Sequence, residues 1–250
     1  MIERMTGMHA ITLQGFGGVE NFRLEQVPLP SAQDGNILVQ IKAVAFNPID
    51  YQIRQGLGER KLLHSPILGR EFAGIITGGD LRATGFQKGD SVYGYAGSLG
   101  SNGTYAEYIS VPAAVLAKIP DGLSFETAAA VPMAGLTALQ CVTRLQVPAQ
   151  ASVFVAGGSG GVGAWVLKLL RPAGVERLVT TAGGAASRAA LRRLGLGDGQ
   201  IVDYREPQWV QSALSANDGA PYPYCIDAVG GALSEACARL LSIHGSYADI

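Results

Sequence analysis

Short runs in the first half of the chain alternate apolar and polar residues and are separated by turn residues. The runs lie at residues 9–17, 22–30, 36–46, 72–79, 90–97 and 104–112. Alternation with a period of two places every second side chain on one face, as in half-buried antiparallel strands. The pattern therefore predicts an irregular β-barrel or sandwich over residues 1–123.

From residue 124 onward the apolar spacing lengthens to that of helices. Ser124 offers a polar helix start, and Pro132 is expected to end one helix before another runs on to residue 145. Strand-like runs at 152–156, 177–182, 200–204, 224–229 and 242–250 then alternate with helical runs at 162–171, 187–195, 209–216 and 233–241. Residues 124–250 are therefore predicted to form a doubly wound parallel sheet, whose ligand crevice lies at the carboxyl ends of its strands.

Composition narrows the class of partner. The 250 residues are 48% hydrophobic and 16% charged, which suffices for two modest cores. A chain with a net charge of -1 lacks the excess positive charge that binds nucleic acid or an anionic membrane. The charge therefore favours a small-molecule partner. No apolar run approaches the length of a membrane span. Cys141, Cys225 and Cys237 show no paired spacing, which fits a reducing cytoplasm.

A glycine-rich turn joins the first strand of the second half to its following helix. Residues 152–163 read SVFVAGGSGGVG, an apolar β-branched run that leads into five glycines. The N–H groups and partial positive charge at a helix start bind pyrophosphate, and glycines let the backbone approach it. The residues expected to form this cradle are Ser159, Gly160, Gly161, Val162 and Gly163. The alternative, a turn that binds nothing, stays open at this point.

The end of the next strand bears on which dinucleotide fits. Sites that prefer NADH place an acid there, which accepts from the ribose 2′-hydroxyl and repels a 2′-phosphate. Here Thr181 and Ala182 are followed by two glycines and no acid. Ser187 and Arg188 follow, and Tyr204 ends the third strand. The arrangement favours NADPH, although Arg188 read alone is also compatible with a solvated helix charge.

Eight strings spread over the chain carry a family resemblance. They are AFNPIDYQIRQG (45–56), ILGREFAGII (67–76), KGDSVYGY (88–95), GTYAEYISVP (103–112), AAAVPMAGLTALQ (128–140), VAGGSGGVG (155–163), IVDYREP (201–207) and DAVGG (227–231). Together and in this order they resemble the medium-chain dehydrogenase/reductases, in their zinc-free quinone-oxidoreductase and enoyl-reductase branch.

The resemblance implies a GroES-like substrate domain at 1–123 and a Rossmann NADP-binding domain at 124–250, with the nicotinamide between them. It adds Thr137 and Val229 to the cofactor-binding residues, beside the loop residues, Thr181, Ser187, Arg188 and Tyr204. Family members commonly carry a lysine at the position of Ser187, so Arg188 is expected to supply that charge.

Zinc is not expected at either of the family's metal positions. Zinc-dependent relatives place a cysteine where this chain has Asn47 and a histidine where it has Arg70. Residues 1–140 contain no cysteine, and His9, His64 and His244 show no ligand spacing. A catalytic zinc needs three such protein ligands.

A cleft without a Lewis acid suits conjugate reduction of a quinone or enone, in which hydride adds to an activated double bond. Asn47 is expected to orient nicotinamide or substrate, since its amide both donates and accepts. Tyr51 is expected to donate a proton or to stack on a flat substrate. It stands one residue before the tyrosine of the quinone-oxidoreductase pattern, where this chain has Gln52. A tyrosine that only packs between the domains is the alternative.

Two further expectations complete the sequence reading. Asp50 and Glu71 are expected to form internal ion pairs, with Arg54 and Arg70 as the candidate partners. The resemblance also implies that the chain is C-terminally truncated, because family members, which are usually dimeric, continue into a last Rossmann strand and a return to the barrel. The function expected is NADPH-dependent, zinc-independent reduction of quinones or α,β-unsaturated carbonyls. A noncatalytic NADPH-binding or interaction protein is the alternative.

Overall fold

The computed structural model describes residues 7–32, 35–56, 65–82, 84–97, 103–175 and 177–250. The chain divides into two compact units, unit 1 at Met1–Met133 and unit 2 at Ala134–Ile250. The division falls ten residues after the boundary expected from the sequence pattern, because the helix at Phe125–Ala129 packs against strands of unit 1.

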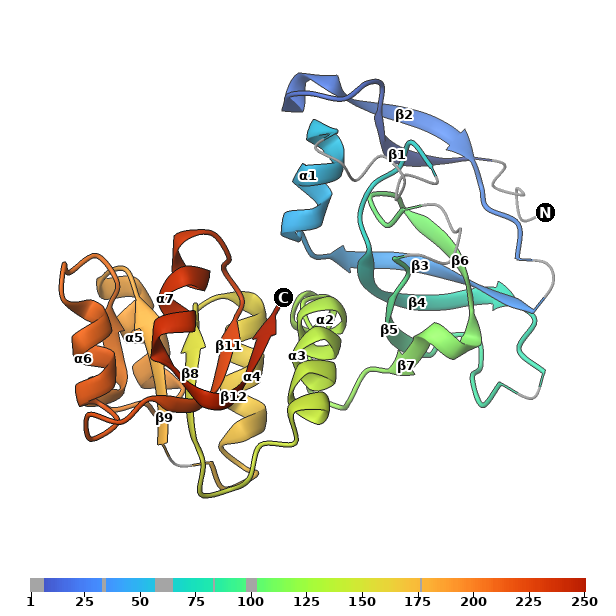
Figure 1. Cartoon of the computed structure of the whole chain (residues 1–250). Helices are drawn as coiled ribbons and strands as arrows, with labels where there is room; N and C mark the ends of the chain where they lie inside the picture. The colour runs from blue at the N-terminus through green and yellow to red at the C-terminus, as the bar shows by residue number, and fades with distance from the viewer. Residues whose placement is uncertain (1–6, 33–34, 57–64, 83, 98–102, 176) are drawn as a thin grey trace. The chain divides into compact units, whose positions relative to one another are not determined.

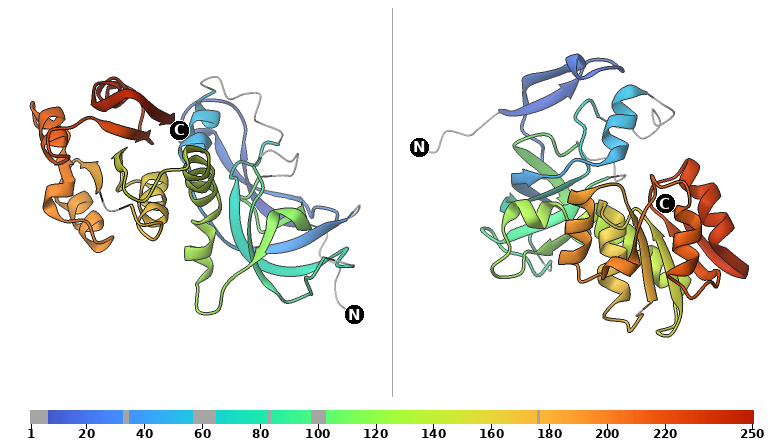
Figure 2. Two further views of the ribbon diagram at one scale, coloured as in Figure 1. Left: turned by 60° about the horizontal axis from the view of Figure 1, so that its bottom comes forward. Right: turned by 90° about the vertical axis from the view of Figure 1, so that its left-hand side faces the viewer.

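Unit 1 consists mainly of antiparallel strands (Figures 1 and 2). A two-stranded sheet joins β1 (Gly7–Leu13) to β2 (Phe22–Pro28). A five-stranded sheet has the order β6-β3-β4-β5-β7. Its strands are β3 (Asn36–Val44), β4 (Glu71–Gly79), β5 (Ser91–Tyr95), β6 (Tyr108–Pro112) and β7 (Leu116–Lys118). Short 3-10 helices lie at Val19–Asn21 and Ala113–Val115.

The core of unit 1 follows from the alternation of its strands. Its central buried cluster contains Ile37, Val39, Phe72, Ile76, Val92, Ala96, Ile109 and Val111. The described residues of the unit also form the helices α1 (Pro48–Gln55) and α2 (Phe125–Ala129). The Ser124 hydroxyl caps α2 by accepting from the Thr127 N–H at 3.2 Å. Ala128 and Ala129 then pack on Ala73 of β4, where small residues allow close approach.

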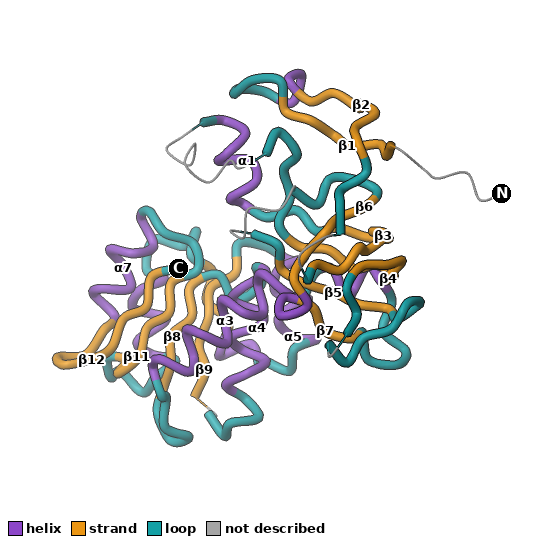
Figure 3. Tube along the Cα trace, turned by 90° about the vertical axis from the view of Figure 1, so that its right-hand side faces the viewer, coloured by secondary structure: helices purple, strands orange, loops and turns teal. Residues whose placement is uncertain are grey.

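Unit 2 is a parallel five-stranded sheet with the order β10-β9-β8-β11-β12, most of which can be followed in Figure 3. The strands are β8 (Ser152–Ala156), β9 (Arg177–Ala182), β10 (Ile201–Asp203), β11 (Tyr222–Asp227) and β12 (Leu241–Asp249). The helices are α3 (Pro132–Leu145), whose first two residues belong to unit 1, α4 (Gly161–Leu170), α5 (Ala185–Arg193), α6 (Trp209–Ser215) and α7 (Ala232–Leu240), with a 3-10 helix at Asp198–Gln200.

Successive residues of β8 point to opposite faces of this sheet. Val153 and Val155 pack with side chains of α3, α4 and α5, whereas Phe154 and Ala156 pack with α6 and α7. Helices therefore cover both faces, as the alternation of strands and helices predicts. Within the described part of the chain, none of the helices is long and apolar enough to cross a membrane.

The predicted fold class, a GroES-like β domain followed by a doubly wound Rossmann domain, is confirmed. The break at Pro132 is also confirmed, since α2 ends before it and α3 begins on it. The sequence pattern missed β7, because three residues are too few to show an alternation.

Candidate functional site

A cavity of about 390 Å³ opens in unit 2 at the carboxyl ends of the parallel strands. Its lining comes from the segments that follow β8, β9, β10 and β11. The lining residues are Gly157, Ser159, Gly160, Thr181, Ala182, Gly183, Ser187, Tyr204, Ala228, Val229 and Leu233. The cavity therefore lies at the edge of the sheet where doubly wound proteins bind their ligands.

The glycine-rich loop leaves β8 in a conformation that side chains would block. Gly157 has a φ of +75°, and a Cβ built on it would lie 2.5 Å from Val229 Cγ2. A Cβ on Gly163 would lie 2.3 Å from the Gly157 carbonyl oxygen. Gly160 caps α4, so the first N–H groups of that helix have no acceptor within it. These donors at the cavity mouth fit an anionic pyrophosphate.

Two threonines of β9 hold this loop in place. Thr180 Oγ1 accepts from the Gly158 N–H at 2.9 Å and donates to the Val155 carbonyl at 2.6 Å. Thr181 Oγ1 accepts from the Gly157 N–H, also at 2.9 Å. Both side chains are almost fully buried. Sequence reasoning gave Thr181 a binding role and missed Thr180, since no motif marks a hydroxyl that anchors a loop from the neighbouring strand.

Replacing Thr180 with valine removes this anchor at almost constant volume. We expect the free energy of unfolding to fall by about 1–3 kcal/mol, because the buried Gly158 N–H loses its acceptor. Affinity for NADPH should fall with it. Urea unfolding and a cofactor titration measure the two effects, with Thr143→Val, an exposed site on α3, as the control. Equal behaviour of the two variants would show that the hydroxyl does not hold the loop.

Six of the expected cofactor residues line the cavity together. They are Ser159, Gly160, Thr181, Ser187, Tyr204 and Val229. Gly161, Val162 and Gly163 lie behind them in the first turn of α4. Thr137 lies half-buried on α3 and is not among the lining residues. The structure thus brings together residues from four separate segments of the sequence.

Arg188 has a hydrogen-bond partner on the neighbouring strand. Its Nη1 donates to the Ile201 carbonyl of β10 at 3.1 Å, and it does not line the cavity. Neighbouring residues on a helix point about 100° apart, so Ser187 and Arg188 leave α5 in different directions. Of the two, the structure places Ser187 at the cavity and Arg188 against the backbone of β10.

A third anchoring residue, Asp227, ends β11. Its Oδ1 accepts from the N–H groups of Val229 and Gly230 at 2.9 and 3.0 Å. Its Oδ2 accepts from the hydroxyls of Ser234 and Tyr247 at 2.7 and 3.0 Å. Burial alone would raise the pKa of this carboxyl, but the four hydrogen bonds outweigh it and lower the pKa. Asp227 therefore fixes the loop that carries Ala228 and Val229 into the cavity wall.

Unit 1 contains a separate buried polar cluster around Asn47, which caps α1. Asn47 Nδ2 donates to Glu71 Oε1 at 2.7 Å, and the Met133 N–H donates to Glu71 Oε2 at 2.7 Å. The Asn47 N–H donates to Asp50 Oδ2 at 2.9 Å. Glu71 is 1% exposed and Asn47 is 9% exposed. Glu71 accepts from one of the two N–H donors of the Asn47 amide, so the second N–H is a donor that a ligand can use.

Burial disfavours the charged form of both carboxyl groups in this cluster. Burial raises the pKa of Asp50, although the Asn47 N–H, Tyr105 and the charge of Arg70 act in the opposite direction. Burial likewise raises the pKa of Glu71. Asp50 Oδ1, Thr104 Oγ1 and the Tyr105 hydroxyl are buried and have no well-aligned hydrogen bond to a described residue.

The prediction that Arg54 forms an ion pair with Asp50 or Glu71 is wrong, because Arg54 Nη1 donates to the Gly17 carbonyl instead. Arg70 acts on Asp50 through its charge. Its Nη1 donates to the Gly97 carbonyl at 2.9 Å. The carboxylates of Asp50 and Glu71 are thus held mainly by backbone N–H groups and by Asn47.

The raised pKa of Asp50 predicts a pH-dependent stability. The folded state binds this proton more tightly than the unfolded state, so the stability it contributes is complete below the ordinary pKa of 3.8 and is lost as the pH rises through the folded value. The stability of Asp50→Asn relative to that of the wild type should therefore increase from acid to neutral pH. Urea unfolding midpoints of both proteins at acid pH and at neutral pH measure this, with the exposed Asp121→Asn as control. A difference that does not change with pH would contradict the shift.

Tyr51 lies on the outer face of α1, opposite Ile53, which is 2% exposed. Its own side chain is 38% exposed, and its ring stacks on Phe46 with 6.4 Å between centroids and 25° between planes. Phe46 is 68% exposed. The two rings form an aromatic platform on unit 1, which is open to a flat ligand.

The described residues contain no cluster of three or more His, Cys, Asp or Glu side chains that suits a metal ion. His64, one of the three histidines named in the sequence, lies outside the described residues.

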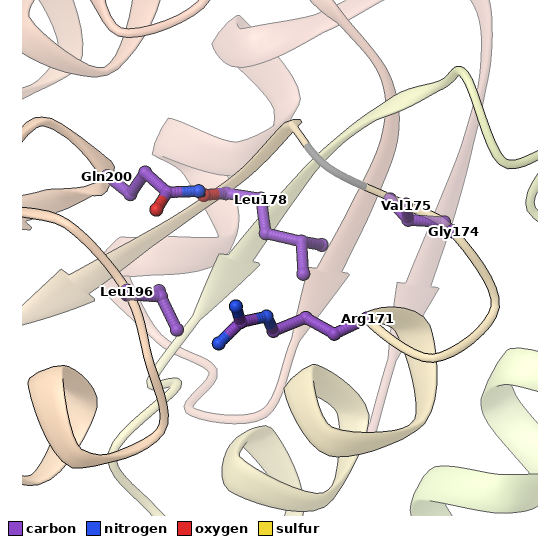
Figure 4. A pocket seen from close by; sticks show the side chains of 6 residues that line it. All are labelled: Arg171, Gly174, Val175, Leu178, Leu196 and Gln200. Carbon is purple, nitrogen blue, oxygen red and sulfur yellow. The ribbon is translucent and has the colours of Figure 1, made fainter.

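A second cavity of about 320 Å³ lies at the amino end of β9 in unit 2. Arg171 extends into it beneath Leu178, as Figure 4 shows, and donates to the Leu194 carbonyl. Gln200 Nε2 donates to the Leu178 carbonyl at 2.9 Å. The side chains of Arg171 and Gln200 therefore donate to nearby backbone carbonyl groups.

The comparisons with known proteins agree with this arrangement. Residues 33–121 match the alcohol dehydrogenase GroES-like domain. The chain is 28% identical to a chloroplast envelope quinone oxidoreductase homolog of Arabidopsis thaliana, over 97% of this chain and 74% of the relative. The structure of the quinone oxidoreductase from Coxiella burnetii is 31% identical and superposes with a TM-score of 0.86, over 96% of this chain and 74% of that one. The chain belongs to the medium-chain dehydrogenase/reductase superfamily, in its quinone-oxidoreductase-like branch.

Two further relatives bear on cofactor and length. A mycobacterial protein whose structure was solved with NADPH is 28% identical, with a TM-score of 0.83, over 96% of this chain and 73% of that one. Human quinone oxidoreductase is 30% identical over 81% of this chain, which spans 60% of the human protein. The relatives thus support NAD(P)H-dependent oxidoreduction by this superfamily member.

Proposed function

We propose that this chain catalyses the NADPH-dependent, zinc-independent reduction of quinones or α,β-unsaturated carbonyl compounds in the cytoplasm. The observation that carries the proposal is the cavity at the carboxyl ends of β8, β9 and β11, with the glycine loop at its mouth. The fit to a dinucleotide rests on the open first turn of α4 and on loop positions that a Cβ would block. The free cysteines fit a reducing compartment.

The residues of unit 2 bind and orient the cofactor in this proposal. The first turn of α4 binds the pyrophosphate, while Ser187 and Tyr204 contact the ribose phosphate. The residue at the end of β9 is Ala182 and not an acid, so no carboxylate at this position repels that phosphate. The bound cofactor supplies the hydride.

The residues of unit 1 supply polarity and a flat surface. The Asn47 amide, held by Glu71, orients a carbonyl or carboxamide through its remaining groups. A carboxamide at position 47 and a guanidinium at position 70 are poor zinc ligands, which supports a reaction without that metal. Conjugate reduction suits such a site, because a quinone or enone carries its own electron sink.

A titration of NADPH fluorescence, followed by NADPH oxidation assays with a panel of quinones and enones, tests the proposal. We expect binding, tighter for NADPH than for NADH, and oxidation in the presence of a metal chelator. Binding without oxidation across the panel would favour a noncatalytic NADPH-binding protein. Failure to bind NADPH would contradict the proposal outright.

The platform of Tyr51 and Phe46 gives a separate prediction. Because the Tyr51 ring is exposed and stacked, we expect Tyr51→Phe to keep KM and kcat near those of the wild type. Tyr51→Ala should raise the KM for a quinone by about threefold to tenfold, since a lost aromatic contact costs roughly 0.5–1.5 kcal/mol. Steady-state kinetics measure both, with the exposed Gln55→Ala on the same helix as control. A loss of kcat in Tyr51→Phe would instead identify the phenol as a proton donor.

A further inference from the structure

An acid does stand beside the end of β9, on the neighbouring strand. In the register of the two strands, Asp203 of β10 pairs with Ala182 of β9. Ala182 lines the cavity, and the side chain of Asp203 is 12% exposed. A carboxylate this close to the ribose site would by itself favour the 2′-hydroxyl of NADH over a 2′-phosphate.

Arg205 neutralises this carboxylate. Its Nε donates to Asp203 Oδ1 at 2.9 Å and its Nη2 donates to Oδ2 at 2.6 Å, which is a bidentate pair. The backbone N–H of Arg205 adds a third hydrogen bond at 3.0 Å. The side-chain hydrogen bonds from Arg205, with a smaller effect of the charge on Arg188, lower the pKa of Asp203. Asp203 is therefore ionised, and its charge is balanced by its neighbours.

The remaining nitrogen of Arg205 faces the entrance of α5. Nη1 lies 3.9 Å from the position a Cβ would take on Gly184, the N-cap residue of that helix. Among the described residues, Nη1 has no hydrogen-bond partner of its own, and the side chain is 57% exposed. Tyr204, the residue between Asp203 and Arg205, lines the cavity, with its hydroxyl packed against Gly183.

We propose that Asp203 and Arg205 form the pair that selects NADPH over NADH. Arg205 binds the 2′-phosphate through Nη1, beside Ser187 and Tyr204, and at the same time balances the charge of Asp203. The proposal assigns this contact to Arg205 and not to Arg188, whose Nη1 donates to the Ile201 carbonyl. This inference rests on the proposed function, since it assigns one end of the same cofactor.

Dissociation constants for both cofactors test the pair. Arg205→Gln should weaken NADPH roughly tenfold, because a charge-assisted hydrogen bond is lost and the Asp203 charge is exposed to the phosphate. NADH affinity should stay the same or increase. Asp203→Asn should leave NADPH binding intact or tighter, and the double variant should recover part of the loss. Arg177→Gln is the matched control, as it breaks the exposed Arg177–Asp218 pair of 2.9 Å in the same unit.

The outcomes separate the inference from the proposed function. An equal loss of NADPH and NADH affinity in Arg205→Gln would mean that the pair only stabilises the fold, and would overturn the inference. Unchanged NADPH affinity in Arg205→Gln, with a wild type that still prefers NADPH, would overturn the inference and leave the function standing. A wild-type chain that binds neither cofactor would overturn both.

Discussion

Replacing Gly163 with alanine should reduce NADPH affinity by about one to two orders of magnitude and cost about 1–3 kcal/mol of unfolding free energy. The added Cβ would lie 2.3 Å from the Gly157 carbonyl oxygen and 2.8 Å from both Gly157 C and Gly158 Cα. These are backbone atoms, so no rotamer change relieves the clash. The loop must move away from the first turn of α4, and the proposed pyrophosphate site moves with it.

Gly199→Ala, in the 3-10 helix at Asp198–Gln200 of the same unit, is the control. A Cβ built on Gly199 would have no atom within 4 Å. Urea unfolding and NADPH titration of both variants measure the difference. If Gly163→Ala bound NADPH as tightly as Gly199→Ala, the close packing of the loop on α4 would not matter for binding.

Asp227→Ala should produce the second large effect. The four donors that Asp227 now accepts, two backbone N–H groups and the hydroxyls of Ser234 and Tyr247, would lose a buried acceptor. We expect a loss of about 2–4 kcal/mol in unfolding free energy. NADPH affinity should also fall, because Ala228 and Val229 line the cavity on the loop that Asp227 holds.

Asp227→Asn divides this effect into two parts. An asparagine oxygen can still accept from the Val229 and Gly230 N–H groups, but its amide nitrogen cannot accept from the hydroxyls. An intermediate loss is therefore expected. Glu235→Ala, at an exposed position on α7, is the control. Wild-type stability and cofactor affinity in Asp227→Ala would contradict the role of this carboxyl.

The sequence predicted the fold well because the informative patterns are local. The alternation of the first half and the strand-helix order of the second half both appear within windows of about ten residues. The glycine loop was also readable, since its strand and helix flank it directly. The three residues of β7 were too short to show any period.

The candidate site was predicted less completely, because side-chain direction depends on neighbours that are distant in sequence. The sequence assigned both Ser187 and Arg188 to the cofactor, but it could not show that Ser187 lines the cavity while Arg188 Nη1 donates to the Ile201 carbonyl. The acid at Asp203 was missed because strand register brings it beside Ala182 across 21 positions of the chain. The roles of Thr180 and Asp227 depend on similar long-range contacts.

A crystal structure of the chain with NADPH is the most direct test of the central claim. The account predicts density across the cavity at the carboxyl ends of the strands, with the pyrophosphate against the first turn of α4 and the ribose phosphate beside Tyr204 and Arg205. Density in the cavity lined by Arg171 and Gln200, or no bound cofactor at saturating NADPH, would contradict it.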